Sequence, residues 1–214
     1  MSISEKEFSH RLSEEAQEAA ELFSNAGQES QERTAVAGLL RVLGLDFQED
    51  EIIKRGPEPI DVWFRDARFQ VTEILDKGRP RNLEIKQRSE RMKRAKRLDD
   101  LLERGTISSD PIPPEEFAAL ISERCAEKAE KYAGQCGDVD LAIYVNLRGR
   151  HLYPTEPFPP LKANLCRGWR SVTVITERFA VVLQATAKAP TFLGSRRGQM
   201  VYWDKMESVF PRLR

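Results

Sequence analysis

Three acidic residues have the types and the spacing that phosphodiester chemistry requires of a protein. Asp61 follows Pro59 at the start of a predicted strand, and Glu73 lies twelve residues later in the partner strand. Glu32 lies four residues before Val36 in a predicted helix, so it projects from the same buried stripe. Carboxylates that two adjacent strands and a packed helix bring together form an oxygen-donor site suited to Mg²⁺ or Mn²⁺.

Glu73 is the most informative of the three positions. Alternation along its strand places it on one face with Phe69, Val71 and Leu75. A carboxylate in an apolar row is costly to bury unless it is paired, hydrogen-bonded or bound to a metal ion. A divalent ion polarises a phosphoryl oxygen and generates hydroxide near neutral pH, so we expect Asp61 and Glu73 to be metal ligands.

Each carboxylate also has a structural interpretation. Asp61 is compatible with a turn or the first position of a strand, and Glu32 with an acid that complements a helix dipole. Glu73 is compatible with an ion pair to Arg65 or Arg68. The combination of the three residues favours the site over these alternatives.

The elements that must position these residues follow from hydrophobic periodicity. The middle of the chain has the order helix, three strands, two helices and a strand, which predicts a mixed α/β fold. The segment 179–184 is compatible with either a strand or a helix. We expect helices at 5–23, 29–43, 82–104 and 115–133, and strands at 45–53, 60–64, 69–75, 139–146, 169–176, 179–184 and 200–203.

Charge is unevenly distributed along a chain whose formal net charge is zero. Residues 1–60 contain thirteen acidic and six basic residues, whereas residues 77–97 contain ten basic and two acidic ones. A dense basic run is typical of a surface that binds a polyanion, although a solvated helix face or a surface for docking and oligomerisation has the same composition. We expect DNA contacts from Arg79, Arg81, Arg88, Arg91, Lys93 and Arg94, and from Arg170, which follows an aromatic residue. The adjacent Trp169 is equally typical of a core residue that opens a strand.

Composition excludes several other classes. The 214 residues are 40% hydrophobic and 32% charged, which is globular composition with no apolar run long enough to span a membrane. Three scattered cysteines predict reduced thiols in the cytoplasm, and two histidines argue against a zinc site. Glycine-rich phosphate-binding loops are absent from the sequence.

The acidic residues and their element order resemble the PD-(D/E)xK nuclease superfamily. The matching residues are Glu32 on the helix, Asp61 after Pro59 for the first motif, and Glu73 for the second. The segments DVWFRDARFQV, DKGR and GWRSVTVI are similar to a small bacterial family described as an endonuclease of unknown function, over most of the chain from about residue 20. The resemblance implies a restriction-endonuclease-like core of helix, three-stranded meander, helix and strand, with an added N-terminal helix and added C-terminal strands.

The chain departs from the superfamily pattern at one position. The pattern has a lysine two residues after the second carboxylate, where this chain has Leu75. A literal E-x-K occurs at Glu84 and Lys86, but residues two apart on a helix point in different directions. We therefore expect Lys86 or Lys77 to reach the site from outside the motif and to stabilise the charged transition state.

The sequence thus predicts an N-terminal helical segment, residues 1–28, and one nuclease-like α/β domain, residues 29–214. We expect a cytoplasmic, Mg²⁺- or Mn²⁺-dependent endonuclease that acts on DNA, with Asp61 and Glu73 as ligands and Glu32 as an accessory carboxylate. The alternative is an inactive nuclease-fold protein that binds nucleic acid or a protein partner. The resemblance is also compatible with a homodimer.

Overall fold

The computed structural model describes residues 28–54, 57–78, 110–147, 150–152, 168–176 and 178–202, and the single positions 7, 10, 11, 14, 90, 91 and 94. The single positions all have helical backbone, within the predicted helices 5–23 and 82–104. The other residues of those two helices lie outside the described residues. So do five of the predicted site residues, which are Arg79, Arg81, Lys86, Arg88 and Lys93.

The chain divides into two compact units. One consists of residues 1–31, 77–107 and 211–214, and the other of residues 32–76 and 108–210. This division groups the basic segment 77–97 with the N-terminal segment, whereas the sequence placed it in the α/β domain. The candidate carboxylates all belong to the second unit.

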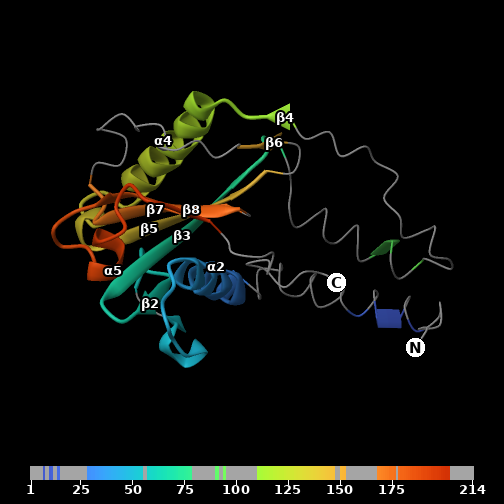
Figure 1. The fold of residues 1–214 in the computed structure, drawn as a ribbon, viewed down its shortest axis with the longest axis horizontal. Helices are drawn as coiled ribbons and strands as arrows, with labels where there is room; N and C mark the ends of the chain where they lie inside the picture. The colour runs from blue at the N-terminus through green and yellow to red at the C-terminus, as the bar shows by residue number, and fades with distance from the viewer. Residues whose placement is uncertain are drawn as a thin grey trace. The chain divides into compact units, whose positions relative to one another are not determined.

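A seven-stranded mixed sheet organises the second unit (Figure 1). Its order is β1-β2-β3-β5-β7-β8-β9, with β3, β5 and β7 parallel and antiparallel pairs on either side of them. The strands are β1 (Ile53–Lys54), β2 (Val62–Phe64), β3 (Ala67–Leu75), β5 (Asp140–Asn146), β7 (Ser171–Ile175), β8 (Phe179–Ala185) and β9 (Met200–Tyr202). A second, two-stranded parallel sheet consists of β4 (Asp110–Pro111) and β6 (Arg150–His151).

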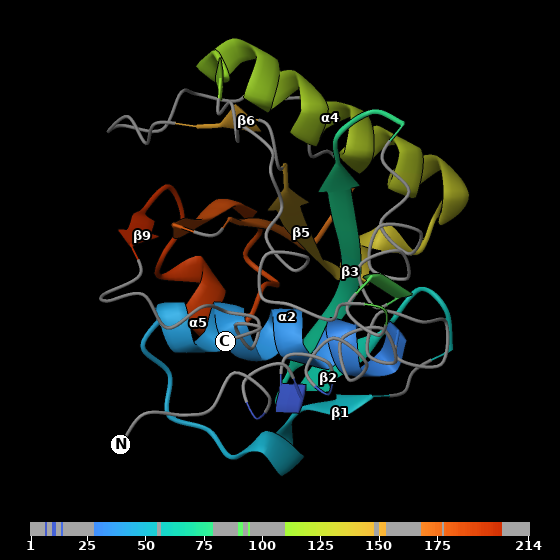
Figure 2. The ribbon, with the colours of Figure 1, turned by 90° about the vertical axis from the view of Figure 1, so that its right-hand side faces the viewer.

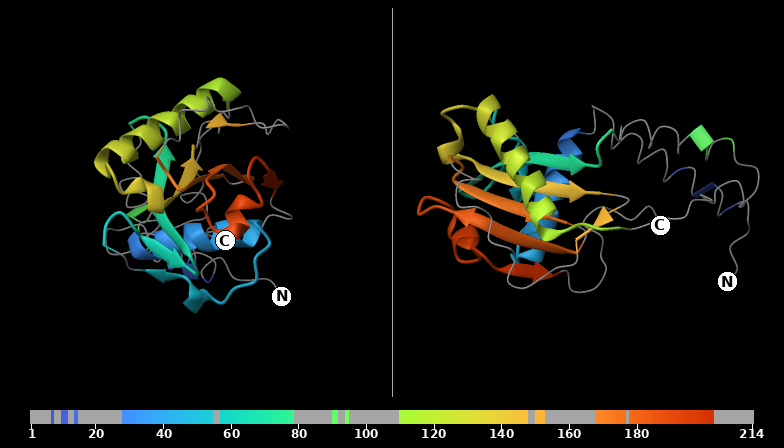
Figure 3. Two further views of the ribbon diagram at one scale, coloured as in Figure 1. Left: turned by 90° about the vertical axis from the view of Figure 1, so that its left-hand side faces the viewer. Right: turned by 90° about the horizontal axis from the view of Figure 1, so that it is seen from above.

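Two helices cover opposite faces of the large sheet (Figures 2 and 3). The helix α2 (Gln28–Val42) packs Val36, Leu39 and Leu40 into one core with Phe64 and Phe69. The helix α4 (Pro114–Lys131) packs a second core, in which its buried residues meet alternate residues of β5 and β7. A short helix, α5 (Thr191–Gly194), adds Leu193 to the first core.

The predicted mixed α/β fold is confirmed, and most elements lie within a few residues of their predicted bounds. The segment 179–185 is the strand β8, so the helical alternative is wrong. The predicted strand 45–53 is also wrong, because most of it is a loop that contains a 3₁₀ turn at Glu49–Glu51 (η1). There the backbone N–H of Gln48 donates to Glu51 Oε2 at 2.7 Å. A carboxylate therefore accepts the hydrogen bond that the carbonyl of a neighbouring strand would accept in a sheet.

The hairpin of β2 and β3 determines which side chains meet. Its turn consists of Arg65 and Asp66, and Phe64 pairs with Ala67 while Val62 pairs with Phe69. The sequence analysis placed the turn at 65–68, two residues longer. Asp61, which precedes β2, also bonds to Phe69, because its N–H donates to the Phe69 carbonyl.

Candidate functional site

Asp61 lies where β2 begins, and its side chain continues the bonding pattern of the sheet. Its N–H donates to the carbonyl of Phe69 at 2.8 Å. The next amide on that edge of β3, the N–H of Val71, donates to Asp61 Oδ2 at 2.8 Å. The carboxylate thus replaces a backbone carbonyl where the pairing with β2 stops.

Gln70 is the side-chain neighbour of Asp61. Its Nε2 donates to Asp61 Oδ2 and to the carbonyl of Val71, the latter at 3.0 Å. Gln70 is only 4% exposed, and its Oε1 is buried without a hydrogen-bond partner within the described part of the chain. A buried amide oxygen without a partner is uncommon in proteins.

Glu73 lies on the other face of β3. Alternation separates it from Gln70, and its neighbours Val71 and Tyr144 pack in the core beneath α2. Asn146 Nδ2 donates to Glu73 Oε1 at 3.0 Å. Asp61 and Glu73 have different hydrogen-bond partners: the Val71 N–H and the Gln70 amide for Asp61, and the Asn146 amide for Glu73.

Glu32 lies on Glu73's side of the sheet, since it is a buried residue of α2. The three predicted carboxylates do not form a three-ligand site, because within the described ranges no three His, Cys, Asp or Glu side chains gather in a way that could hold a metal ion. Mg²⁺ binding by Asp61 and Glu73 stays a prediction.

Lys128 is the described lysine that has an electrostatic interaction with Asp61. It lies on α4, three residues after the buried Cys125 and four before the buried Tyr132. Burial lowers the pKa of Lys128, as do the charges of Lys131 and Arg124, while Glu127 and Asp61 oppose the decrease. By contrast, Lys77, one of the predicted lysines, is exposed beyond the end of β3.

The end of α4 is also connected to the chain just before Asp61. Lys131 Nζ lies 3.7 Å from Glu58 Oε2 and donates a hydrogen bond to the hydroxyl of Tyr132 at 2.9 Å. These contacts raise the pKa of Lys131, chiefly through the bond to Tyr132. The last turn of α4 therefore lies next to the segment that leads into β2.

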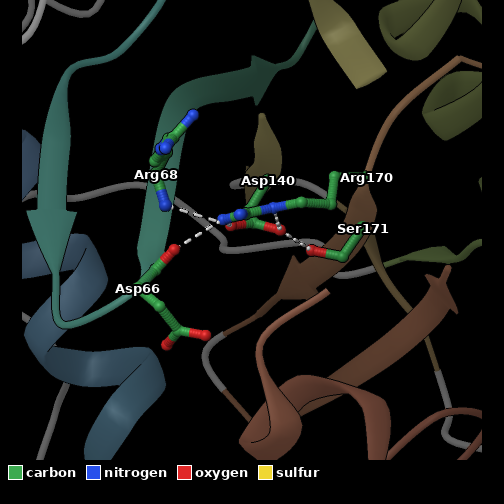
Figure 4. A network of polar contacts seen from close by, with 5 residues as sticks. All are labelled: Asp66, Arg68, Asp140, Arg170 and Ser171. Carbon is green, nitrogen blue, oxygen red and sulfur yellow. Dashed lines mark hydrogen bonds and ion pairs between the residues drawn. The ribbon is translucent and has the colours of Figure 1, made fainter. Parts of the chain in front are cut away.

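Arg170, a predicted DNA contact, is instead part of a buried polar network (Figure 4). It is 7% exposed, and it forms a bidentate ion pair with Asp140, which is 0% exposed. Its Nη2 also donates to the carbonyl of Asp66 at 2.9 Å, and Asp140 accepts further bonds from the Arg68 N–H and the Ser171 hydroxyl. Nε and Nη2 of Arg170 are thus bonded inside the protein, which argues against the predicted DNA contact.

Trp169 is a core residue, in agreement with the alternative interpretation. It is 1% exposed, and its Nε1 donates to the carbonyl of Cys125 at 3.3 Å. Of the predicted DNA-contacting residues in the basic segment, Arg91 and Arg94 are described and exposed. Arg94 lies 3.7 Å from Glu90, one helical turn away.

Sequence comparison assigns the chain to a family. The family described as "Putative endonuclease, protein of unknown function (DUF1780)" matches residues 4–208. The chain belongs to the DUF1780 family. Among curated proteins, none matches this chain.

A solved structure resembles this DUF1780 chain over nearly its whole length. It is a protein of unknown function from Pseudomonas aeruginosa strain PAO1, described as a member of the monooxygenase superfamily. The two share 26% sequence identity and a TM-score of 0.65, over 94% of this chain and 97% of the other. In the described part of this DUF1780 chain, no helix has the length and apolar character needed to cross a membrane.

Two residues of this site in the DUF1780 chain, Gln70 and Lys128, were missed by the sequence analysis. A signal for Lys128 was present in the sequence. Lys128 is the next position on the stripe of α4 formed by Phe117, Ile121 and Cys125, where an apolar residue is expected. The signal for Gln70 was the hairpin itself. Gln70 directly follows Phe69, the residue of β3 to which the Asp61 N–H donates.

We expect stability to depend on pH through Lys128. Its pKa in the folded protein lies below the usual 10.5, so the unfolded chain binds more protons over the interval between the two values. The free energy of unfolding should therefore rise with pH across that interval, and this rise should be absent in Lys128→Met. Urea unfolding of both proteins at neutral pH and just below pH 10.5 measures it; parallel changes would contradict the expectation.

Proposed function

We propose that this DUF1780 protein is an endonuclease that acts on DNA, with its site on the α4-facing side of β3. The observation that carries the proposal is the pair formed by Asp61 and Gln70, whose buried Oε1 has no hydrogen-bond partner among the described residues. The family description supports the activity. The order helix, meander, helix, strand in α2, β1 to β3, α4 and β5 agrees with the nuclease superfamily that the sequence resembles.

The donor atoms of Asp61 and Gln70 suit a divalent cation. Asp61 offers a carboxylate, and Gln70, whose Nε2 donates to that carboxylate, offers an amide oxygen. Mg²⁺ is commonly held by one or two carboxylates together with water and substrate phosphates, so Asp61 and Gln70 would be its protein ligands. When bound, the ion would supply polarisation of a phosphoryl oxygen and an activated water.

The protein's own residues have three tasks in this proposal. Asp61 keeps its carboxylate fixed, because the Val71 N–H and the Gln70 amide both hold it. Gln70 is only 4% exposed, so little water reaches its amide, and this strengthens any electrostatic interaction made there. The basic segment 77–97, with a net charge of +8, directly follows β3 and would contact the phosphate backbone.

A second candidate function is a nuclease-fold protein that binds DNA without cutting it. Two observations favour it: Leu75 occupies the position of the superfamily lysine, and both hydrogen bonds to Asp61 Oδ2 come from the protein itself. A homodimer remains a prediction from the resemblance, which light scattering in solution would test.

Incubation of the purified protein with supercoiled and linear DNA distinguishes the two functions. We expect nicking or cleavage that requires Mg²⁺ or Mn²⁺, and binding that weakens about 10³-fold between 50 and 200 mM salt if six phosphates are contacted. Anisotropy of a labelled duplex measures the binding. Metal-dependent binding without cleavage would support the second function, and the absence of binding at low salt would refute both.

A further inference from the structure

A lysine lies on the packed face of α4, with its Nζ 6.0 Å from the centre of the ring of the buried Tyr132. The stripe of α4 that faces the sheet contains Phe117, Ile121 and Cys125, all buried in the core of that face. Lys128 continues the same stripe, where an amphipathic helix normally has an apolar residue. A charged side chain at such a position is costly unless another group uses its charge.

The surroundings of Lys128 are those of a half-buried cation beside a candidate site. From its own helix it meets the charges of Lys131, Arg124 and Glu127, and from the start of β2 it meets Asp61. Gln70 and Thr72 are buried and lie on the face of β3 that α4 covers, as does Ile74 of the same core. Burial is the main cause that lowers the pKa of Lys128, and the charges of Lys131 and Arg124 add to it.

We propose that Lys128 binds a phosphodiester oxygen of DNA at the Asp61–Gln70 site, where it supplies the positive charge that Leu75 cannot. The inference rests on the proposed function and extends it to a residue outside the nuclease motifs. An ammonium group held away from bulk water interacts more strongly with phosphate than an exposed one does. In the transition state of phosphoryl transfer, charge on the equatorial oxygens increases the stabilisation that such a cation provides.

Substitution of Lys128 by Met or Arg tests this role, with Lys131→Met as the matched control. All three variants should fold, because Met suits an apolar stripe, Arg keeps the charge and Lys131 is exposed. If Lys128 contacts one phosphate, Lys128→Met should reduce the slope of log affinity against log salt by about 0.9, while Lys128→Arg retains it. Cleavage at saturating DNA should fall about 10²- to 10³-fold in Lys128→Met and change little in Lys131→Met.

A measurement without DNA separates this inference from the proposed function. Lysines of the whole protein are dimethylated with ¹³C-formaldehyde, and the Lys128 signal is assigned in the NMR spectrum from its loss in Lys128→Arg. We expect dimethyl phosphate to shift the Lys128 signal and not that of Lys131. If the shift occurs but the protein neither binds nor cuts DNA, the proposed function fails while the phosphodiester site stands. If the signal does not move and Lys128→Met binds and cuts DNA like the unmodified protein, the inference is wrong.

Discussion

Replacing Arg170 by Met is expected to lower the free energy of unfolding by about 3–5 kcal/mol. The substitution leaves Asp140 as a carboxylate that is 0% exposed and has lost its bidentate partner. It also removes the bond from Arg170 to the carbonyl of Asp66 in the turn between β2 and β3. One residue therefore connects the hairpin, β5 and β7, as Figure 4 shows. Urea unfolding followed by circular dichroism measures the loss.

The double variant Asp140→Leu, Arg170→Met separates the buried charge from the lost contacts. Removing both ions avoids an unpaired charge, so the double variant should be more stable than Arg170→Met alone. Recovery should be incomplete, because the Arg68 N–H and the Ser171 hydroxyl lose their acceptor. Arg150→Met is the matched control, since Arg150 pairs with Glu116 at the surface and its loss should matter much less. A double variant as unstable as the single one would contradict this account.

The sequence predicts the strands of the sheet's centre well because their burial leaves a clear pattern. All residues of β5 but Asn146, and all residues of β7, are buried, which produces the nearly continuous apolar runs at 139–146 and 171–175. The failure at 45–53 has a local cause. The acidic run Glu49–Glu51 forms a turn that Gln48 caps, and only Ile53–Lys54 pair with β2.

The network of Arg170 was beyond prediction for a different reason. Its partners, Asp140 and the carbonyl of Asp66, are 30 and 104 residues away in the sequence. Only the parallel order of β3, β5 and β7 brings them together at one end of the sheet. An arginine next to a tryptophan is compatible with a nucleic-acid contact until the strand order is known.

The face of the sheet on which Asp61 lies could not be derived from strand alternation. Asp61 precedes β2, and its N–H donates to the carbonyl of Phe69, the residue that pairs with Val62. Two consecutive residues therefore oppose one residue of β3, and the regular alternation of side chains ends there. The apolar row around Glu73 was correctly identified, but the row faces α2.

This arrangement predicts opposite outcomes for two conservative substitutions. Asp61→Asn should reduce DNA cleavage about 10²-fold or more, because it removes the one carboxylate of the site. Glu73→Gln should leave cleavage within a few-fold, since Glu73 bonds to Asn146 and Gln keeps an oxygen that accepts this bond. Gln70→Leu should resemble Asp61→Asn, because it removes the buried Oε1 while preserving much of the side-chain volume. Rates of plasmid nicking at saturating protein measure all three.

Folding and binding data determine how these rates are interpreted. Asp61→Asn retains an oxygen that can accept the Val71 N–H, so its unfolding transition should stay close to that of the unmodified protein. Its affinity for DNA should also persist, because the basic segment supplies most of the phosphate contacts. A loss of cleavage with stability and binding intact would thus assign Asp61 a role in the chemical step. If Glu73→Gln abolishes cleavage while Asp61→Asn does not, the site lies on the α2 face, and the Asp61–Gln70 pair serves only to end the pairing of β2 with β3.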